Sequence, residues 1–120
     1  MKAQEITDAT IALLHSGEYR YGRINFANGD MVGHTGNLDA AISAMETVDK
    51  CVQQLIDVIQ ELDGILIYTS DHGNADQMFT ELETGERIPM TSHTLAPVPF
   101  VIYDPQNSEE YELVPLDDAG

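Results

Sequence analysis

The sequence predicts an α/β fold, a mostly parallel sheet with crossover helices, because a long amphipathic segment lies between two strand-like runs. Apolar residues recur at three- and four-residue steps from Asn37 to Leu62, which is typical of a helix with one buried face. Residues 21–26 before it and residues 64–69 after it have the length and composition of strands. Since strand, helix, strand is the order of a crossover unit, we expect these two strands to be parallel.

The first part of the chain predicts one short helix and one strand. Apolar positions from Lys2 to Ser16 follow a helical spacing, and Gly17 is a typical helix stop. The candidate strand at residues 21–26 ends in a glycine-containing turn at residues 28–30. Ligands of parallel sheets collect beyond the carboxyl ends of the strands, so this turn is a candidate site position.

The second part predicts two further strands and an exposed connection. Residues 64–69 are apolar throughout, which is typical of a strand covered on both faces. The polar stretch at residues 80–87 predicts a hairpin or loop, and two prolines restrain the start of a strand at residues 97–103. Residues 108–120 are acidic and offer no closing helix. Three strands and two helices would leave sheet edges open, so we expect an incomplete domain.

The charge of the chain restricts its partners. The 120 residues include 5 Lys and Arg against 21 Asp and Glu, a formal net charge of −16. Such a surface repels nucleic acid and anionic membranes, so we expect neither as a partner. It would also repel a phosphorylated substrate unless bound cations reversed the local field.

The remaining composition indicates an ordinary globular protein of the cytoplasm. A hydrophobic fraction of 42% argues against wholesale disorder, and 120 residues suffice for one core. The single Cys51 excludes an internal disulfide and fits a reducing compartment. We see no signal-peptide pattern and no long apolar run, so we expect a cytoplasmic location. The sequence says nothing about self-association.

Five side chains suited to metal binding lie where the chain changes direction. Asp30 and His34 are four residues apart and would face the same way on a helical turn. Asp71 and His72 directly follow the apolar run, and His93 lies in a third turn rich in hydroxyl side chains. Aspartate and histidine together suit divalent ions of the manganese and zinc type. The alternative interpretation is that all five are ordinary polar turn residues.

Three motifs make the sequence similar to a known family. In this order and spacing they closely resemble cofactor-independent phosphoglycerate mutase, of the alkaline phosphatase-like superfamily. The motifs are Asn25–Gly36, Thr69–Ala75 and Thr91–Pro99. The resemblance spans nearly all of this chain but only a C-terminal portion of the family's chain. It implies that residues 1–120 are a fragment of the metal-binding domain, a partial alkaline phosphatase-like sandwich.

The resemblance also implies two divalent ions, usually manganese, with zinc or cobalt as alternatives. By matching motif positions, Asp30, His34 and His93 would bind one ion, and Asp71 and His72 would be two ligands of the second. In the family the second ion is completed by an aspartate and by the serine nucleophile, both from far upstream. Neither motif is found here, nor is the family's substrate-binding domain. We therefore assign no catalytic nucleophile within the 120 residues.

The implied activity is that of the complete enzyme, which interconverts 3-phosphoglycerate and 2-phosphoglycerate through a phosphoserine in glycolysis and gluconeogenesis. We expect the isolated segment to be inactive. One alternative is another metal-dependent phosphatase or phosphomutase of the same superfamily, and a second is a non-catalytic metal-binding fragment. A third is an Fe(II) oxygenase with a two-histidine, one-carboxylate set. An Fe(II) oxygenase site would not need the extra pair of Asp71 and His72, which argues against that interpretation.

Overall fold

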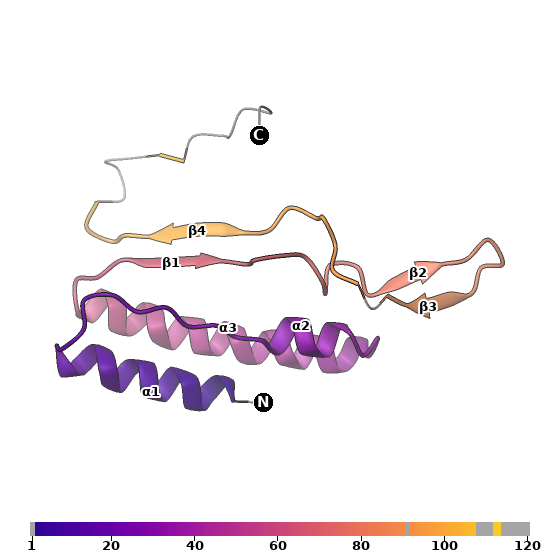
Figure 1. The fold of residues 1–120 in the computed structure, drawn as a ribbon. Helices are drawn as coiled ribbons and strands as arrows, with labels where there is room; N and C mark the ends of the chain where they lie inside the picture. Colours follow the sequence, from indigo (N-terminus) through magenta and orange to yellow (C-terminus); the bar gives the residue numbers. More distant parts are fainter. Residues whose placement is uncertain (1, 91, 108–111, 114–120) are drawn as a thin grey trace.

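A computed structural model describes residues 2–90, 92–107 and 112–113 of the chain. These residues form three helices and two pairs of short strands: α1 (Ala3–Ser16), α2 (Asn28–Gly33), α3 (Leu38–Glu61), β1 (Leu66–Thr69), β2 (Phe79–Glu81), β3 (Arg87–Pro89) and β4 (Phe100–Tyr103). Helix α3 lies between α1 and the β1–β4 pair, and the β2–β3 pair projects from one end (Figure 1). The predicted acidic segment at residues 108–120 falls almost wholly outside the described residues.

The predicted short helix and the predicted long helix are both confirmed, and so is Gly17 as the stop of the first. The side chain of Asn37 accepts a hydrogen bond from the Ala40 N–H at 3.0 Å and so caps the start of α3. Gly17 closes α1 with a φ of +70°, a left-handed conformation that costs little without a Cβ atom. Local chemistry therefore sets the start of α3, through a side-chain cap, and the end of α1, through the conformational freedom of glycine.

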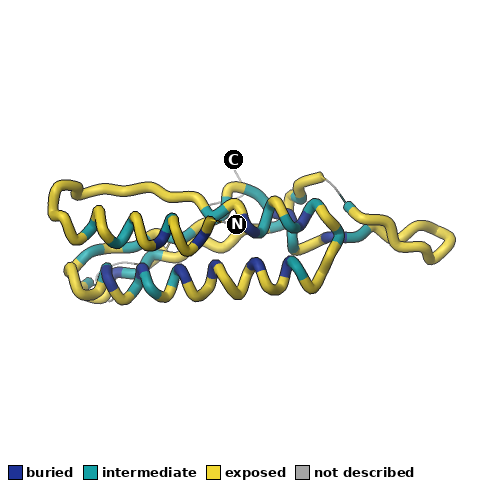
Figure 2. Tube along the Cα trace, turned by 90° about the horizontal axis from the view of Figure 1, so that it is seen from below, coloured by how far each residue is buried: buried dark blue, intermediate teal, exposed yellow. Residues whose placement is uncertain are grey.

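The core lies along one stripe of α3, which α1 covers. Its buried residues recur at helical spacing and include Ala44, Val48, Cys51 and Leu55, with Cys51 fully buried. Thr7 of α1 is also buried, and its hydroxyl donates to the Ala3 carbonyl at 2.9 Å. Figure 2 shows these buried positions repeating along the helices, whereas the connection after α1 and the β2–β3 pair are mostly exposed.

The sheet differs from the prediction of parallel strands. The mixed α/β class is confirmed, but both strand pairs within the described residues are antiparallel. Leu66 pairs with Tyr103 and Thr69 with Phe100, so β4 runs back along β1. Residues 21–26, all of them described, belong to no strand, and the expected crossover unit is not formed. Apolar composition indicates an extended segment but does not encode its partner, which is why the prediction was wrong.

Strand β1 is also more open than its composition predicted. Ile65 and Ile67 are 56% and 61% exposed, whereas Leu66 and Tyr68 are half-buried on the side that faces α3. A continuous apolar run therefore marks a strand that has only one face covered among the residues described. The expected hairpin near residues 80–87 is confirmed, since β2 pairs with β3 around a turn that contains Gly85 at φ +81°.

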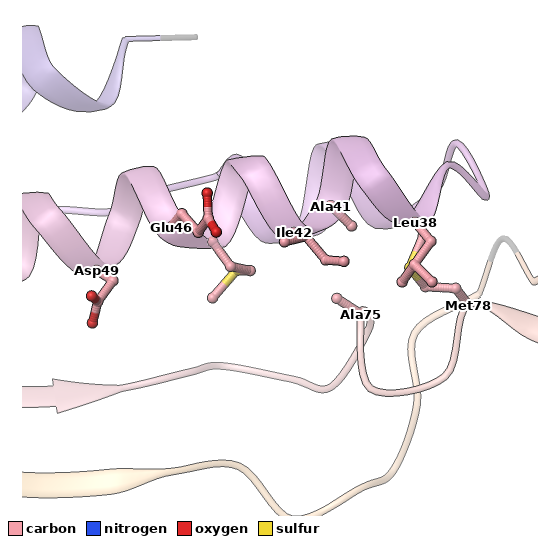
Figure 3. Close-up of a pocket in the computed structure, with 8 residues that line it drawn as sticks. Leu38, Ala41, Ile42, Glu46, Asp49, Ala75 and Met78 are labelled. Carbon is pink, nitrogen blue, oxygen red and sulfur yellow. The ribbon is translucent and has the colours of Figure 1, made fainter.

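An open apolar groove of about 500 Å³ runs between the start of α3 and the segment after β1. Its lining residues are Leu38, Ala41, Ile42, Met45, Glu46, Asp49, Ala75 and Met78. In Figure 3, Ala75 and Met78 lie opposite the first turns of α3. Leu38 and Ile42 are each at least half exposed, so this side of the helix is not closed into a core. No described helix combines the length and the apolar character needed to cross a membrane.

Candidate metal centre

Helix α2 places the first two candidate ligands on one side of a single turn. His34 directly follows this helix, and its N–H donates to the Asp30 carbonyl at 3.3 Å. The four-residue spacing then brings the His34 imidazole back over the Asp30 carboxylate. The distance from His34 Nε2 to Asp30 Oδ1 is 3.1 Å.

A backbone contact brings the second and third segments together. Thr94 N–H donates to the Gly73 carbonyl at 2.8 Å, an isolated antiparallel bridge between the turn after β1 and the segment before β4. A Cβ atom on Gly73 would collide with the Thr94 hydroxyl, so only glycine allows this approach. As a result the rings of His72 and His93 stack with centroids 3.6 Å apart and planes 13° apart.

Three histidines meet at one carboxylate oxygen. Asp30 Oδ1 lies 3.1 Å from His34 Nε2, 3.1 Å from His93 Nε2 and 3.9 Å from His72 Nε2. Asp30, His72 and His93 also offer ligand atoms that all lie within 4.8 Å of one another. The structure thus gathers four of the five predicted side chains, although they come from three separate segments. Their role as metal ligands stays a prediction.

The fifth predicted ligand, Asp71, lies at the edge of this cluster. Its side chain is 74% exposed, and its Oδ1 is 3.6 Å from His72 Nε2. The resemblance assigned Asp71 and His72 to one ion and Asp30, His34 and His93 to another. In the structure His72 is instead stacked on His93 and faces Asp30, so these side chains form one continuous cluster.

The environment of Asp30 favours its charged form. Partial burial raises the pKa of this carboxyl, but the hydrogen bond from Asn74 and the nearby His34, His93 and His72 outweigh it and lower the pKa below the usual value. Asp30 is therefore an anion at neutral pH. The Nδ1 atom of His72 lies 3.2 Å from the Gly73 carbonyl, which can only accept a hydrogen bond. This contact favours a proton on Nδ1, which in a neutral ring would leave Nε2 as the nitrogen available to a metal ion.

Two further polar residues support the cluster. Asn74 donates from Nδ2 to Asp30 Oδ1 at 2.5 Å. Asp76 was missed: its Oδ2 accepts a hydrogen bond from the Thr94 hydroxyl at 2.8 Å and so fixes the segment that carries His93. The signal that could have found Asp76 is its position, five residues after Asp71 in the same polar turn.

The donor set fits a divalent cation. One anionic carboxylate and three imidazoles are the nitrogen and oxygen ligands that zinc, manganese and cobalt accept. The side chains of His72, His34 and His93 are 27%, 35% and 50% exposed, so an ion could reach the cluster from solvent. A mixed α/β fold with such ligands at the ends of helices and strands is typical of metal-dependent enzymes.

Comparison with known proteins agrees with that class. A family model described as the Metalloenzyme superfamily matches residues 1–115, and the chain therefore belongs to this superfamily.

Two similar curated relatives carry the same name. The chain is 48% identical over 120 residues to a 2,3-bisphosphoglycerate-independent phosphoglycerate mutase of Clostridioides difficile, an alignment that covers 100% of this chain and 22% of that protein. It is 46% identical over 110 residues to the protein of the same name in Trypanosoma brucei brucei, covering 85% of this chain and 20% of that one. The chain thus spans about a fifth of the length of these relatives.

A solved structure shares the fold. Leishmania mexicana phosphoglycerate mutase, crystallised at low cobalt concentration, matches with a TM-score of 0.79 and 45% sequence identity. The match covers 86% of this chain and 20% of that one. The expected partial domain is confirmed by this likeness.

Proposed function

We propose that the chain is part of the metal-binding domain of a 2,3-bisphosphoglycerate-independent phosphoglycerate mutase, which as a complete protein interconverts 3-phosphoglycerate and 2-phosphoglycerate. The observation that carries this proposal is the meeting of three histidines at Asp30 Oδ1. Identity of 48% to a relative of that name over the entire chain supports the same conclusion. The proposal implies a phosphoserine route in glycolysis and gluconeogenesis, carried out in the cytoplasm.

Two divalent ions belong to this proposal, manganese first and zinc or cobalt as alternatives. Asp30, His34 and His93 would bind one ion, and Asp71 and His72 would contribute to the second. The short distances from Asp30 Oδ1 to the histidine nitrogens support the first set. The exposed Asp71 beside His72 supports the second, because its carboxylate is free to turn toward an ion.

Each part of the cluster has a defined role in the proposed reaction. When bound, divalent ions lower the pKa of a coordinated serine hydroxyl and neutralise charge on phosphoryl oxygens. The residues of this chain bind and orient those ions, and the surrounding carboxylates, part of a net charge of −16, favour cations near the site. Neither the serine nor the substrate-binding domain is assigned within the 120 residues.

A segment exchange tests the activity. The 120 residues would replace the matching segment of the Clostridioides difficile relative, which they align with over their full length. We expect the chimera to interconvert the two phosphoglycerates, and the same chimera with Asp71→Ala to lose about 100-fold or more in rate, since a bound metal supplies several kcal/mol.

Two outcomes would contradict the proposal. A folded chimera without mutase activity that hydrolyses other sugar phosphates would favour a related phosphatase. Conversion of 3-phosphoglycerate by the 120-residue chain alone would show that no outside serine is needed.

A further inference from the structure

We propose that Asn74 is a positioning residue that holds Asp30 in place for the first divalent ion and links the two groups of ligands. The proposal rests on the metal centre of the proposed function. Asn74 follows Asp71 and His72 in the turn after β1, yet its side chain contacts residues of α2, 44 positions earlier. It is therefore a direct hydrogen-bond link between the segment with Asp71 and His72 and the segment with Asp30 and His34.

The contacts of Asn74 are directed at ligand atoms. Its Nδ2 donates to Asp30 Oδ1 at 2.5 Å and to the Asp30 carbonyl at 3.4 Å, and it lies 3.3 Å from His34 Nε2. The residue is only 8% exposed, so removal of the amide would take away a hydrogen bond to Asp30 Oδ1 that solvent could replace only in part. A hydrogen bond to an anionic oxygen is also stronger than one between neutral groups.

Packing fixes this geometry. A Cβ atom on Gly33 would collide with Asn74 Oδ1, so the glycine at the end of α2 is what lets the amide approach the helix. The Asn74 carbonyl in turn accepts a hydrogen bond from the Gln77 N–H at 3.1 Å, which closes the turn behind the side chain. Both the side chain and the backbone of Asn74 are thereby held.

The contacts of the amide with Asp30 Oδ1 and with His34 Nε2 differ in whether a bound ion can share them. A carboxylate oxygen has lone pairs for both a hydrogen-bond donor and a cation, whereas an imidazole nitrogen has one lone pair. A cation bound at His34 Nε2 would replace the amide there but leave the hydrogen bond to Asp30 intact. Asn74 would thus orient the carboxylate in the loaded centre, in the way that outer partners of metal ligands do.

Metal titration of the 120-residue chain tests the inference. Calorimetry with Mn(II) gives the affinity, and the visible spectrum at saturating Co(II) reports the geometry around the ion. Asn74→Ala is expected to weaken Mn(II) binding by about 10–100-fold and to change the Co(II) spectrum, because the carboxylate loses its fixed orientation. Asn74→Leu, which keeps the volume but has no donor, is expected to behave in the same way and replaces the alanine variant if that one unfolds.

Asn37→Ala is the matched control. It removes the amide that caps α3 and is expected to lower the unfolding temperature while leaving Mn(II) affinity and the Co(II) spectrum as in the parent. If both Asn74 variants bind Mn(II) as the parent does, with the same Co(II) spectrum, the inference is overturned and the metal centre stands. If the folded parent chain binds neither ion, the metal centre itself fails, and the role of Asn74 fails with it.

Discussion

The ligand cluster and the sheet beside it are built in different ways. In the cluster, each polar side chain has a partner within the described residues, and two glycines allow close approach of the segments. In the β1–β4 pair, apolar side chains such as Ile67 and Phe100 are more than half exposed. The cluster is specified by short motifs and one backbone bridge. The β1–β4 pair, in contrast, leaves one apolar face open among the residues described.

The largest expected effect separates the buried core of α3 from the open face of β1. Leu55→Ala on α3, where the side chain is 5% exposed, is expected to lower the free energy of unfolding by about 2–5 kcal/mol because it leaves a cavity. Ile67→Ala on the open face of β1, at 61% exposure, is expected to change it by less than about 0.5 kcal/mol. Urea unfolding measures both. Equal losses would mean that the outer face of the sheet is covered, for instance by a second copy.

Within the cluster, Asp30→Ala should have the largest effect on metal binding. All three histidines face its Oδ1, so its loss should weaken Mn(II) or Zn(II) binding by more than about 100-fold, beyond the effect of losing an outer partner. Asp49→Ala removes the same charge from an exposed position on α3 and is the control. Calorimetry compares the two. Similar affinities for both variants would mean that bulk negative charge, rather than this cluster, attracts the ion.

The bridge between the segments gives a smaller effect. Gly73→Ala places a methyl group against the Thr94 hydroxyl and should lower the free energy of unfolding by about 1–3 kcal/mol. The His93 ring should also be held less firmly in its position. Gly22→Ala introduces the same group where nothing lies within 4 Å. Thermal unfolding and the NMR signals of the His93 ring would report both effects. Unchanged His93 signals in folded Gly73→Ala would show that the bridge does not position this ring.

Local patterns predicted much of the fold. The three- and four-residue spacing located α3, and the conformational freedom of glycine predicted the stop of α1 at Gly17. The pairing of β1 with β4 could not be predicted in the same way. Leu66 and Tyr103 are far apart in the chain, and an apolar strand carries no signal that selects its partner or its direction.

The candidate site shows the same division. The spacing of Asp30 and His34 predicted that their side chains would lie on the same side of a helical turn, as they do at the end of α2. The stacking of His72 on His93 and the bond between Asp76 and Thr94 depend on a long-range bridge, which no spacing reveals.

The bridge at Gly73 and Thr94 also separates the hairpin from the centre. Strands β2 and β3 lie between Gly73 and Thr94 in the chain. The bridge between these two residues therefore holds the two ends of the hairpin segment together. Since lengthening a loop adds little entropic cost, we expect residues inserted near Gly85 to leave the bridge between Gly73 and Thr94 undisturbed. A tag grafted at the hairpin tip is therefore expected to leave the candidate metal centre unchanged.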